Sequence, residues 1–251
     1  MCTLAILRRP GHAWPLIVAG NRDEMKSRPW TAPGRHWPDR PNVIGARDDL
    51  AGGSWIGLND TGVIACVLNR RGTLGPAEGK RSRGELVLDA LDFPDAKDAA
   101  EMLGGLDAGA YRPFNLFVGD DRDAYWVRAT GSGAPEVKPI GEGVALLTAY
   151  DLDDMASPRT RHFLPWFRAA PPPEPATGDW AAWEKLMAAR QGGPDAGEEG
   201  AMNIDLPSGF GTSSTSLIAL PSRKLGLETQ PIWRFAHGHP DAIVYDAVSL
   251  A

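Results

Sequence analysis

Short apolar runs separated by polar turns dominate the first part of the chain. These runs are Cys2–Leu7, Pro15–Ala19, Ser54–Leu58 and Val63–Leu68. Runs of this length between turn-forming residues are typical of β-strands. The residues Asn59-Asp60-Thr61-Gly62 have the composition of a tight turn. We therefore predict two β-hairpins, with a loop rich in Pro, Trp and Arg at residues 27–41 between them.

Helical spacing first appears after residue 81. Apolar residues recur there at the spacing of one helix face, and Ser82 and Glu85 have the spacing of a capping box. This pattern predicts a helix that is capped by Ser82. Further helices are predicted at Asp95–Leu103, Ser157–Arg168 and Asp179–Arg190.

The remaining apolar runs predict more strands. They are Phe114–Val118 and Ala124–Ala129, a third hairpin across Gly119-Asp120-Asp121, and then Val144–Thr148, Ser214–Leu220, Pro231–Phe235 and Ala242–Tyr245. Strands, then helices, then strands indicate an α+β fold rather than alternating βαβ units. The Pro-rich segment at residues 171–178 could mark a domain boundary. Because the strands after it are expected to rejoin the same sheets, we predict one domain over residues 1–251.

Composition narrows the classes of function. The chain has 26 Lys and Arg against 32 Asp and Glu, a net charge of −6, which argues against nucleic acid or an anionic membrane as the main partner. No apolar run approaches the ~20 residues that span a bilayer, and no secretory signal is visible. With only Cys2 and Cys66, neither a disulfide framework nor a Cys-rich zinc site fits. We expect a cytoplasmic protein.

Histidines and glycines give no sign of a cofactor site. His237 and His239 would need a further ligand to hold a metal ion, and none stands at a helpful spacing. Gly52 and Gly53 precede a predicted strand rather than a helix, so they do not fit a phosphate-binding loop. We therefore expect no metal ion.

Cys2 directly follows Met1. Aminopeptidases remove Met when the next side chain is small, and removal would leave a thiol and a free α-amine on Cys2. An α-amine titrates near about 8 and a thiol near about 8.5, so the amine can accept the thiol proton. The alternative is that Cys2 is a small apolar residue at the start of a strand.

Four polar residues follow the second apolar run: Asn21, Arg22, Asp23 and Glu24. If the first two strands pair antiparallel, these residues return towards Cys2. Asp23 could then hold the ammonium or thiol of Cys2, and Asn21 could donate to a substrate carbonyl. A solvated turn at the end of the strand is the alternative.

Several sequence blocks together resemble a known family. They are Met1-Cys2-Thr3-Leu4, Ala19-Gly20-Asn21-Arg22-Asp23-Glu24 with Arg28-Pro29, Gly52–Asn59, Ser82-Arg83-Gly84, Phe114-Asn115-Leu116 and Phe210-Gly211-Thr212. In this order they resemble the NRDE family, whose eukaryotic members are the transport-and-Golgi-organisation protein 2 group. That family is similar to N-terminal-nucleophile (Ntn) hydrolases of the bile salt hydrolase and penicillin V acylase type. The resemblance implies a four-layer αββα sandwich and a catalytic cysteine that begins the mature chain.

The resemblance also implies roles for single residues. Cys2 would be the nucleophile, Asp23 would orient it from the same element as Asn21, and Asn69 would help to form the oxyanion hole. A neutral amide donor suits that last role, although Asn69 taken alone would be a turn residue. The candidates for substrate contact are Arg22, Trp55 and Asn115.

The chain departs from the family pattern at two positions. Leu147-Thr148-Ala149 lacks the Asn that often follows Leu-Ser/Thr, and Ser213 stands where a basic residue is common after Gly-Thr. Both missing groups would help to bind and polarise an amide. Arginines that could substitute are Arg22, Arg70 and Arg159.

Two functions follow from this sequence. The first is an Ntn-type cysteine hydrolase that needs no cofactor and cleaves a carbon–nitrogen amide bond, or a related acyl bond, of a small molecule. The second is a protein on the same scaffold that binds and carries haem, a lipid or an acyl-CoA without turnover. The intact set of Cys2, Asn21, Asp23 and Asn69 favours the first, whereas Ala149 and Ser213 favour the second.

Overall fold

The structure is a computed structural model that describes residues 2–194, 196–197, 200–226 and 228–251. The chain forms two compact units, each built on one antiparallel sheet. The first unit comprises residues 2–28 and 142–248, and the second unit comprises residues 29–141 and 249–251. Met1, on which the predicted amine depends, lies outside the described residues.

The first unit is a sheet in the order β10-β1-β2-β11-β12-β13. Its strands are β1 (Thr3–Arg8), β2 (Leu16–Met25), β10 (Gly143–Leu147), β11 (Phe210–Leu220), β12 (Ile232–Ala236) and β13 (Asp246–Ala247). The two longest strands, β2 and β11, pair with each other over most of their length. The N-terminal hairpin thus joins strands from the C-terminal part of the chain in one sheet.

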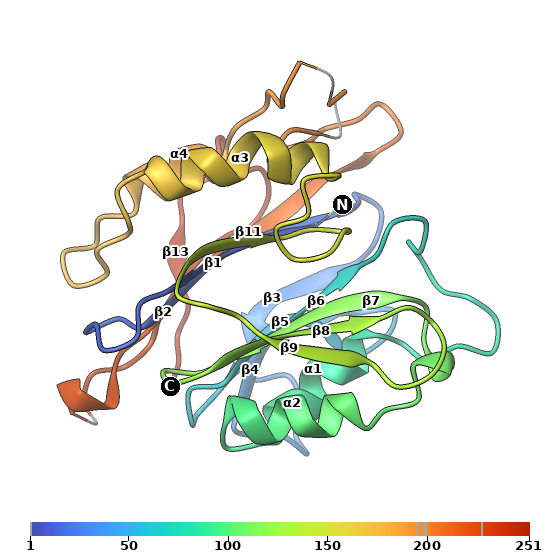
Figure 1. The fold of residues 1–251 in the computed structure, drawn as a ribbon, viewed down its shortest axis with the longest axis horizontal. Coiled ribbons are helices and arrows are strands. Elements are labelled where there is room, and N and C mark those ends of the chain that lie inside the picture. Colours follow the sequence, from blue (N-terminus) through green and yellow to red (C-terminus); the bar gives the residue numbers. More distant parts are fainter. Residues whose placement is uncertain (1, 195, 198–199, 227) are drawn as a thin grey trace. The chain divides into compact units, whose positions relative to one another are not determined.

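Two helices, α3 (Pro158–Ala169) and α4 (Ala181–Met187), lie on one face of this sheet (Figure 1). The aromatic residues Phe163, Phe167 and Trp183 pack there against apolar residues of β1, β2 and β11. Ser157 caps α3, because its side-chain oxygen accepts a hydrogen bond from the Thr160 amide at 3.2 Å. The helix therefore starts at a residue fixed by local sequence.

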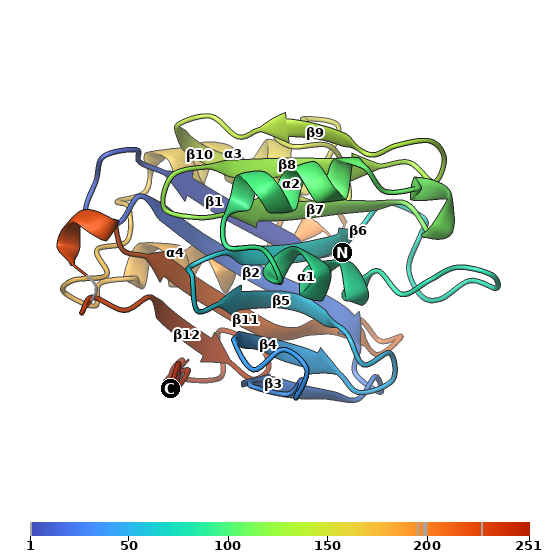
Figure 2. The same cartoon turned by 90° about the horizontal axis from the view of Figure 1, so that it is seen from below.

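The second unit is a sheet in the sequential order β3 to β9. Its strands are β3 (Trp30–Gly34), β4 (Val43–Asp48), β5 (Ser54–Asn59), β6 (Ile64–Asn69), β7 (Phe114–Gly119), β8 (Ala124–Ala129) and β9 (Glu136–Pro139). Helices α1 (Gly84–Leu91) and α2 (Ala96–Gly104) cover one face of this sheet (Figure 2). Their buried Leu, Val and Ala residues form one core with β6, β7 and β8.

Gly53 and Gly84, which come from two separate sequence blocks, lie against each other in the structure. A Cβ atom on Gly53 would lie 2.5 Å from the main-chain carbon of Gly84, at the start of α1. The strand and the helix can approach this closely only because neither residue carries a side chain. The predicted capping box at the same helix start is wrong: Ser82 contacts the Gly84 amide instead, and the Glu85 carboxylate pairs with Arg81.

Most predicted strands are confirmed, including the hairpins β1–β2, β5–β6 and β7–β8. The strands after the Pro-rich segment do rejoin the first sheet. The loop at residues 27–41 contains β3, which the sequence did not predict. The strand predicted at Ala242–Tyr245 is wrong, since pairing there begins only at Asp246.

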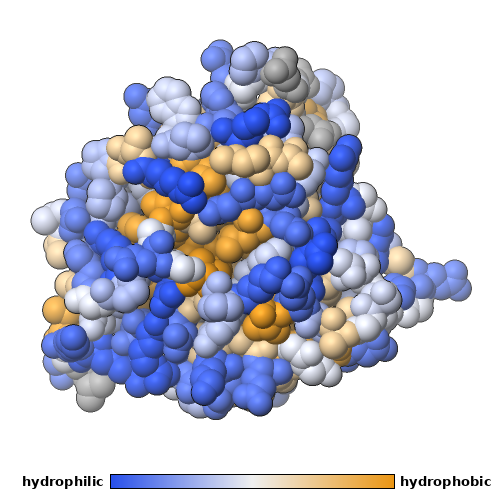
Figure 3. All heavy atoms as spheres, in the orientation of Figure 1, coloured by the Kyte–Doolittle hydropathy of each residue, from blue (hydrophilic) through white to orange (hydrophobic). Residues whose placement is uncertain are grey.

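Hydrophilic residues cover most of the face shown in Figure 3. Across the part of the chain that the structure describes, no helix is both long and apolar enough to cross a membrane.

Candidate active site

Cys2 lies directly before β1, beside the middle of β2. The register pairs Thr3 with Asn21, so residues 21–23 do return to Cys2 as predicted. They do not form a turn, however. Asn21 to Glu24 are part of β2, because β11 pairs with them on the other side.

Strand alternation places the site residues on two faces of the first unit's sheet. Ala5 and Leu7 of β1, and Ile17 and Ala19 of β2, pack on the side of α3 and α4. Side chains alternate along a strand, so Thr3, Asn21 and Asp23 point to that helix side, and Cys2 points to the other. The Cys2 thiol and the Asp23 carboxylate therefore leave the sheet in different directions.

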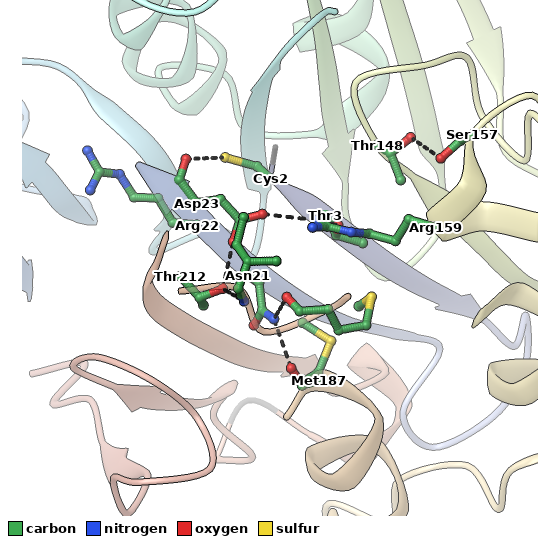
Figure 4. Close-up of polar contacts among 12 residues, drawn as sticks. Cys2, Thr3, Asn21, Arg22, Asp23, Thr148, Ser157, Arg159, Met187 and Thr212 are labelled. Atoms are coloured by element: carbon green, nitrogen blue, oxygen red, sulfur yellow. Dashed lines mark hydrogen bonds and ion pairs between the residues drawn. The ribbon is translucent and has the colours of Figure 1, made fainter. Parts of the chain in front are cut away.

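Asp23 is held in a buried cluster of polar groups (Figure 4). One carboxylate oxygen, Oδ2, lies 3.0 Å from Nη1 of Arg159, which comes from the first turn of α3. The other, Oδ1, accepts a hydrogen bond of 2.8 Å from the Thr212 hydroxyl of β11. Arg159 Nη1 also donates to the Thr3 hydroxyl at 2.6 Å. Two elements, α3 and β11, thus contact the carboxylate, and Arg159 also links it to Thr3 of β1.

The half-buried Cys2 thiol contacts the main chain of Asp23. Its Sγ lies 3.7 Å from the Asp23 carbonyl oxygen, which can accept the thiol proton in a weak hydrogen bond. Burial raises the pKa of the Cys2 thiol, the charge of Asp23 raises it further, and the charge of Arg22 lowers it to a smaller extent. The thiol is therefore protonated at neutral pH.

Asn21 is buried, and its amide is engaged with the protein itself. Its Nδ2 donates to the main-chain carbonyls of Met187 at 2.9 Å and Met202 at 2.8 Å, and its Oδ1 accepts from the Thr215 hydroxyl at 2.6 Å. These contacts anchor two segments of the first unit to β2. Donation from Asn21 to a substrate stays a prediction.

A β-bulge in β11 brings Ser213 to Arg22. The register with β2 shifts between Thr212 and Ser214, which leaves Ser213 as the extra residue. Its hydroxyl accepts from Arg22 Nη1 at 3.1 Å and donates to the Arg22 carbonyl oxygen at 3.1 Å. Arg22 lies opposite the position of Cys2 in the continued register. Ser213, which replaces the family's basic residue, thus orients the arginine of the neighbouring strand.

The remaining predicted residues belong to the second unit. Asn69 is half-buried and ends β6. Asn115 of β7 is fully buried, and its Oδ1 accepts hydrogen bonds from Arg70 Nη1 at 2.6 Å and Trp126 Nε1 at 3.1 Å. Trp55 packs edge-on against Trp30, with ring centroids 5.5 Å apart. The substrate contacts expected of Trp55 and Asn115 stay predictions.

Metal-ligating groups do not gather in the described parts of the chain. No three or more His, Cys, Asp or Glu side chains there are placed to hold a metal ion. His239 instead contacts the Asn203 side chain, with 2.8 Å between Nδ1 and Oδ1.

Comparison with known protein families identifies the chain. The sequence profile described as "Transport and Golgi organisation 2" matches residues 1–171. The chain belongs to this family. A comparison of this chain with curated protein sequences gives no match.

By their titles, solved structures similar to this family member include an acid amidase, a conjugated bile acid hydrolase and an acylase. An N-acylethanolamine-hydrolyzing acid amidase orthologue from Caenorhabditis elegans has a TM-score of 0.60 and 12% identity, covering 92% of this chain and 98% of that one. A conjugated bile acid hydrolase variant from Clostridium perfringens has a TM-score of 0.58 and 13% identity, covering 99% and 92%. Penicillin V acylase from Agrobacterium tumefaciens has a TM-score of 0.51 and 14% identity, covering 98% and 84%. The predicted α+β fold of the Ntn-hydrolase type is confirmed by this likeness.

Sequence reasoning missed two members of the cluster around Asp23 in this family member. Thr3 follows Cys2, and Thr212 lies in the Phe210-Gly211-Thr212 block, but a hydroxyl in a strand gives no sign of its partner. Arg159 was one of three candidate arginines, and only the structure shows that it contacts Asp23. The signal that could have found it is its position in the first turn of a capped helix.

Proposed function

We propose that this protein is an Ntn-type cysteine hydrolase that cleaves an amide or related acyl bond of a small molecule. Cys2 Sγ attacks the carbonyl carbon, and the carbon–nitrogen bond breaks to leave a thioester on Cys2. The thiol proton passes through the Cys2 α-amine to the departing amine. Water then hydrolyses the thioester, releasing a carboxylic acid and restoring the thiol.

The observation that carries this proposal is the position of Cys2 against Asp23. The half-buried thiol contacts the main-chain carbonyl oxygen of Asp23, whose carboxylate is fixed from two sides by Arg159 and Thr212. A thiol with a raised pKa needs a base close by, and an α-amine on the same residue is the nearest one. Removal of the residue before Cys2 would supply that amine.

The other roles rest on the family resemblance. Asp23 orients the nucleophile, and Asn69 with main-chain amides stabilises the oxyanion. Loss of one such donor typically lowers the rate about 100- to 1000-fold. Asn21 holds the site in shape rather than acting on the substrate, since its amide contacts main-chain carbonyls.

The test begins with the N-terminus. Reagents selective for 1,2-aminothiols, such as 2-cyanobenzothiazole, label Cys2 only if Met1 has been removed. A separate, unlabelled sample of the protein is incubated with N-acylethanolamines, penicillin V and conjugated bile acids, the compounds in the titles of its structural neighbours. Release of amine by the wild type and by Cys66→Ala, but not by Cys2→Ala, supports the proposal. A retained Met1, or equal release by Cys2→Ala, contradicts it.

Binding of haem, a lipid or an acyl-CoA without turnover is the second candidate. It is favoured by Ala149, whose buried side chain offers no donor, and by Ser213, whose hydroxyl is engaged with Arg22. A haem-binding protein would use an axial ligand such as Cys2. Titration with haem should then give a Soret band that Cys2→Ala loses, and an unchanged spectrum would count against this candidate.

A further inference from the structure

Arg159 contacts both residues that fix the position of Cys2. Its Nη1 donates to Asp23 Oδ2 at 3.0 Å and to Thr3 Oγ1 at 2.6 Å. Thr3 is bonded to Cys2 along the chain, and the carbonyl oxygen of Asp23 contacts the Cys2 thiol. One nitrogen atom of Arg159 therefore joins Thr3 of β1, the residue that follows Cys2, to Asp23 of the neighbouring strand β2, as Figure 4 shows.

The pair of charges is enclosed by the protein. The Arg159 side chain is 2% exposed and the Asp23 side chain is 0% exposed. When one partner of such a buried pair is removed, the remaining charge has no compensation, and a buried carboxylate then takes up a proton more readily. Arginine suits this place better than lysine, because its guanidinium keeps its proton and offers several donors in a fixed plane.

The placement of Arg159 is built into the start of α3. Ser157 caps the helix. Thr148, which directly follows β10, has its hydroxyl 3.3 Å from the Ser157 hydroxyl. Thr148 precedes Ala149, where the family's expected Asn is missing. This segment thus lacks a side-chain amide, but it fixes the helix turn that carries an arginine to Asp23.

We propose that Arg159 is a positioning residue, which holds Asp23 and Thr3 and through them sets the geometry and the charge around Cys2. This role rests on the proposed function of Cys2 as a nucleophile. Among the described residues, the charges that act on the thiol are those of Asp23 and, to a smaller extent, Arg22, and Arg159 acts on it through Asp23. Arg159 thereby links helix α3 to the reacting residue.

The experiment measures the rate at which iodoacetamide alkylates Cys2 in the full chain. In the Cys66→Ala background Cys2 is the one remaining cysteine, since the chain has two. Rates are followed between about pH 6 and pH 10, the range in which thiols titrate, and only the thiolate reacts. A shift of one unit in the thiol pKa changes the rate at pH 7 about tenfold.

Arg159→Met is expected to shift the midpoint of the pH profile, because the Asp23 carboxylate beside Cys2 loses the cation and the hydrogen bond that hold it. Asp23→Asn/Arg159→Met also lacks the carboxylate and should not show the shift that an uncompensated carboxylate causes. Arg159→Lys keeps the cation and should retain the wild-type midpoint. A wild-type profile in a folded Arg159→Met protein would overturn the proposal, since a merely structural ion pair would change stability alone.

A second comparison serves if Arg159→Met does not fold. Replacing both partners of a buried pair is often tolerated, so Asp23→Asn/Arg159→Met is compared with Asp23→Asn. Asp23→Asn leaves an uncompensated cation and should show the lower thiol pKa of the two, with about tenfold faster alkylation at pH 7 for each unit of difference. Equal profiles overturn the proposal. Because alkylation needs no amide turnover, failure of the hydrolase function would leave these differences unchanged.

Discussion

The hydroxyl of Thr212 provides the sharpest test of the buried cluster. It donates to Asp23 Oδ1 at 2.8 Å and accepts from the Ile204 amide at 3.0 Å. Thr212→Val keeps the shape of the side chain and removes both hydrogen bonds. The loss of a bond to a charged group costs about 1.5–3 kcal/mol, and a buried amide left without an acceptor costs about 1–3 kcal/mol. The sum of the two contributions is an expected fall of about 2.5–6 kcal/mol in the free energy of unfolding.

Thr160 offers a matched control in the same unit. It is fully buried in α3, and among the described residues its hydroxyl has no hydrogen-bond partner. Thr160→Val makes the same chemical change without breaking a bond, so stability should stay unchanged or rise slightly.

Both variants are measured by urea unfolding, followed by far-ultraviolet circular dichroism. The midpoint should fall for Thr212→Val at an unchanged slope, and Tm should fall by about 2–4 °C per kcal/mol for a chain of this size. A loss below about 1 kcal/mol for Thr212→Val, or an equal loss for Thr160→Val, would refute the assignment of stability to these hydrogen bonds.

Three further predictions concern other residues of the structure. Asn21→Leu should lower the free energy of unfolding by about 2–4 kcal/mol in calorimetry, because two main-chain carbonyls and a hydroxyl lose their partner. The rate of Cys2 alkylation should change little. A large change in that rate would instead support a direct catalytic role for Asn21. Gly53→Ala should lower stability by about 1–3 kcal/mol or more through its clash with Gly84, whereas a normal Tm would contradict that close approach. The raised pKa of the Cys2 thiol means that the folded state holds this proton more tightly than the unfolded state. This contribution to the free energy of unfolding is fully present below the ordinary thiol pKa and is lost as pH rises above it. In urea titrations at alkaline pH, wild type should therefore lose stability relative to Cys2→Ala. The same dependence of stability on pH in both proteins would contradict this.

The fold was predictable where the signal is local. The turn between β7 and β8, and the capping aspartate of α2, lie within a few residues of the elements that they end or begin. The continuation of β2 through Asn21 and Asp23 was not predictable, because these polar residues remain in a strand only through pairing with β11, nearly the whole chain away. The edge strand β3 has few apolar residues and no pattern of its own.

The same difference between local signals and long-range contacts holds for the candidate site. Cys2 and Asp23 stand out in sequence, since a thiol after Met1 and a carboxylate at the end of an apolar run are both unusual. The direction of the Asp23 carboxylate, towards α3 rather than the thiol, depends on strand alternation and on Arg159. The substrate contact that the motif around Asn21 predicts stays a prediction, and the contacts of its amide with the Met187 and Met202 carbonyls were not predictable, because both residues lie far along the chain.

The central claim is that Cys2 forms and releases an acyl group. It is tested most directly by the intact mass of the protein over time after addition of one equivalent of an acyl p-nitrophenyl ester. We predict a chain that begins at Cys2, gains one acyl group on its N-terminal peptide and then returns to its starting mass. An acyl group that stays on the protein, or one that also appears on Cys2→Ala, would contradict the claim.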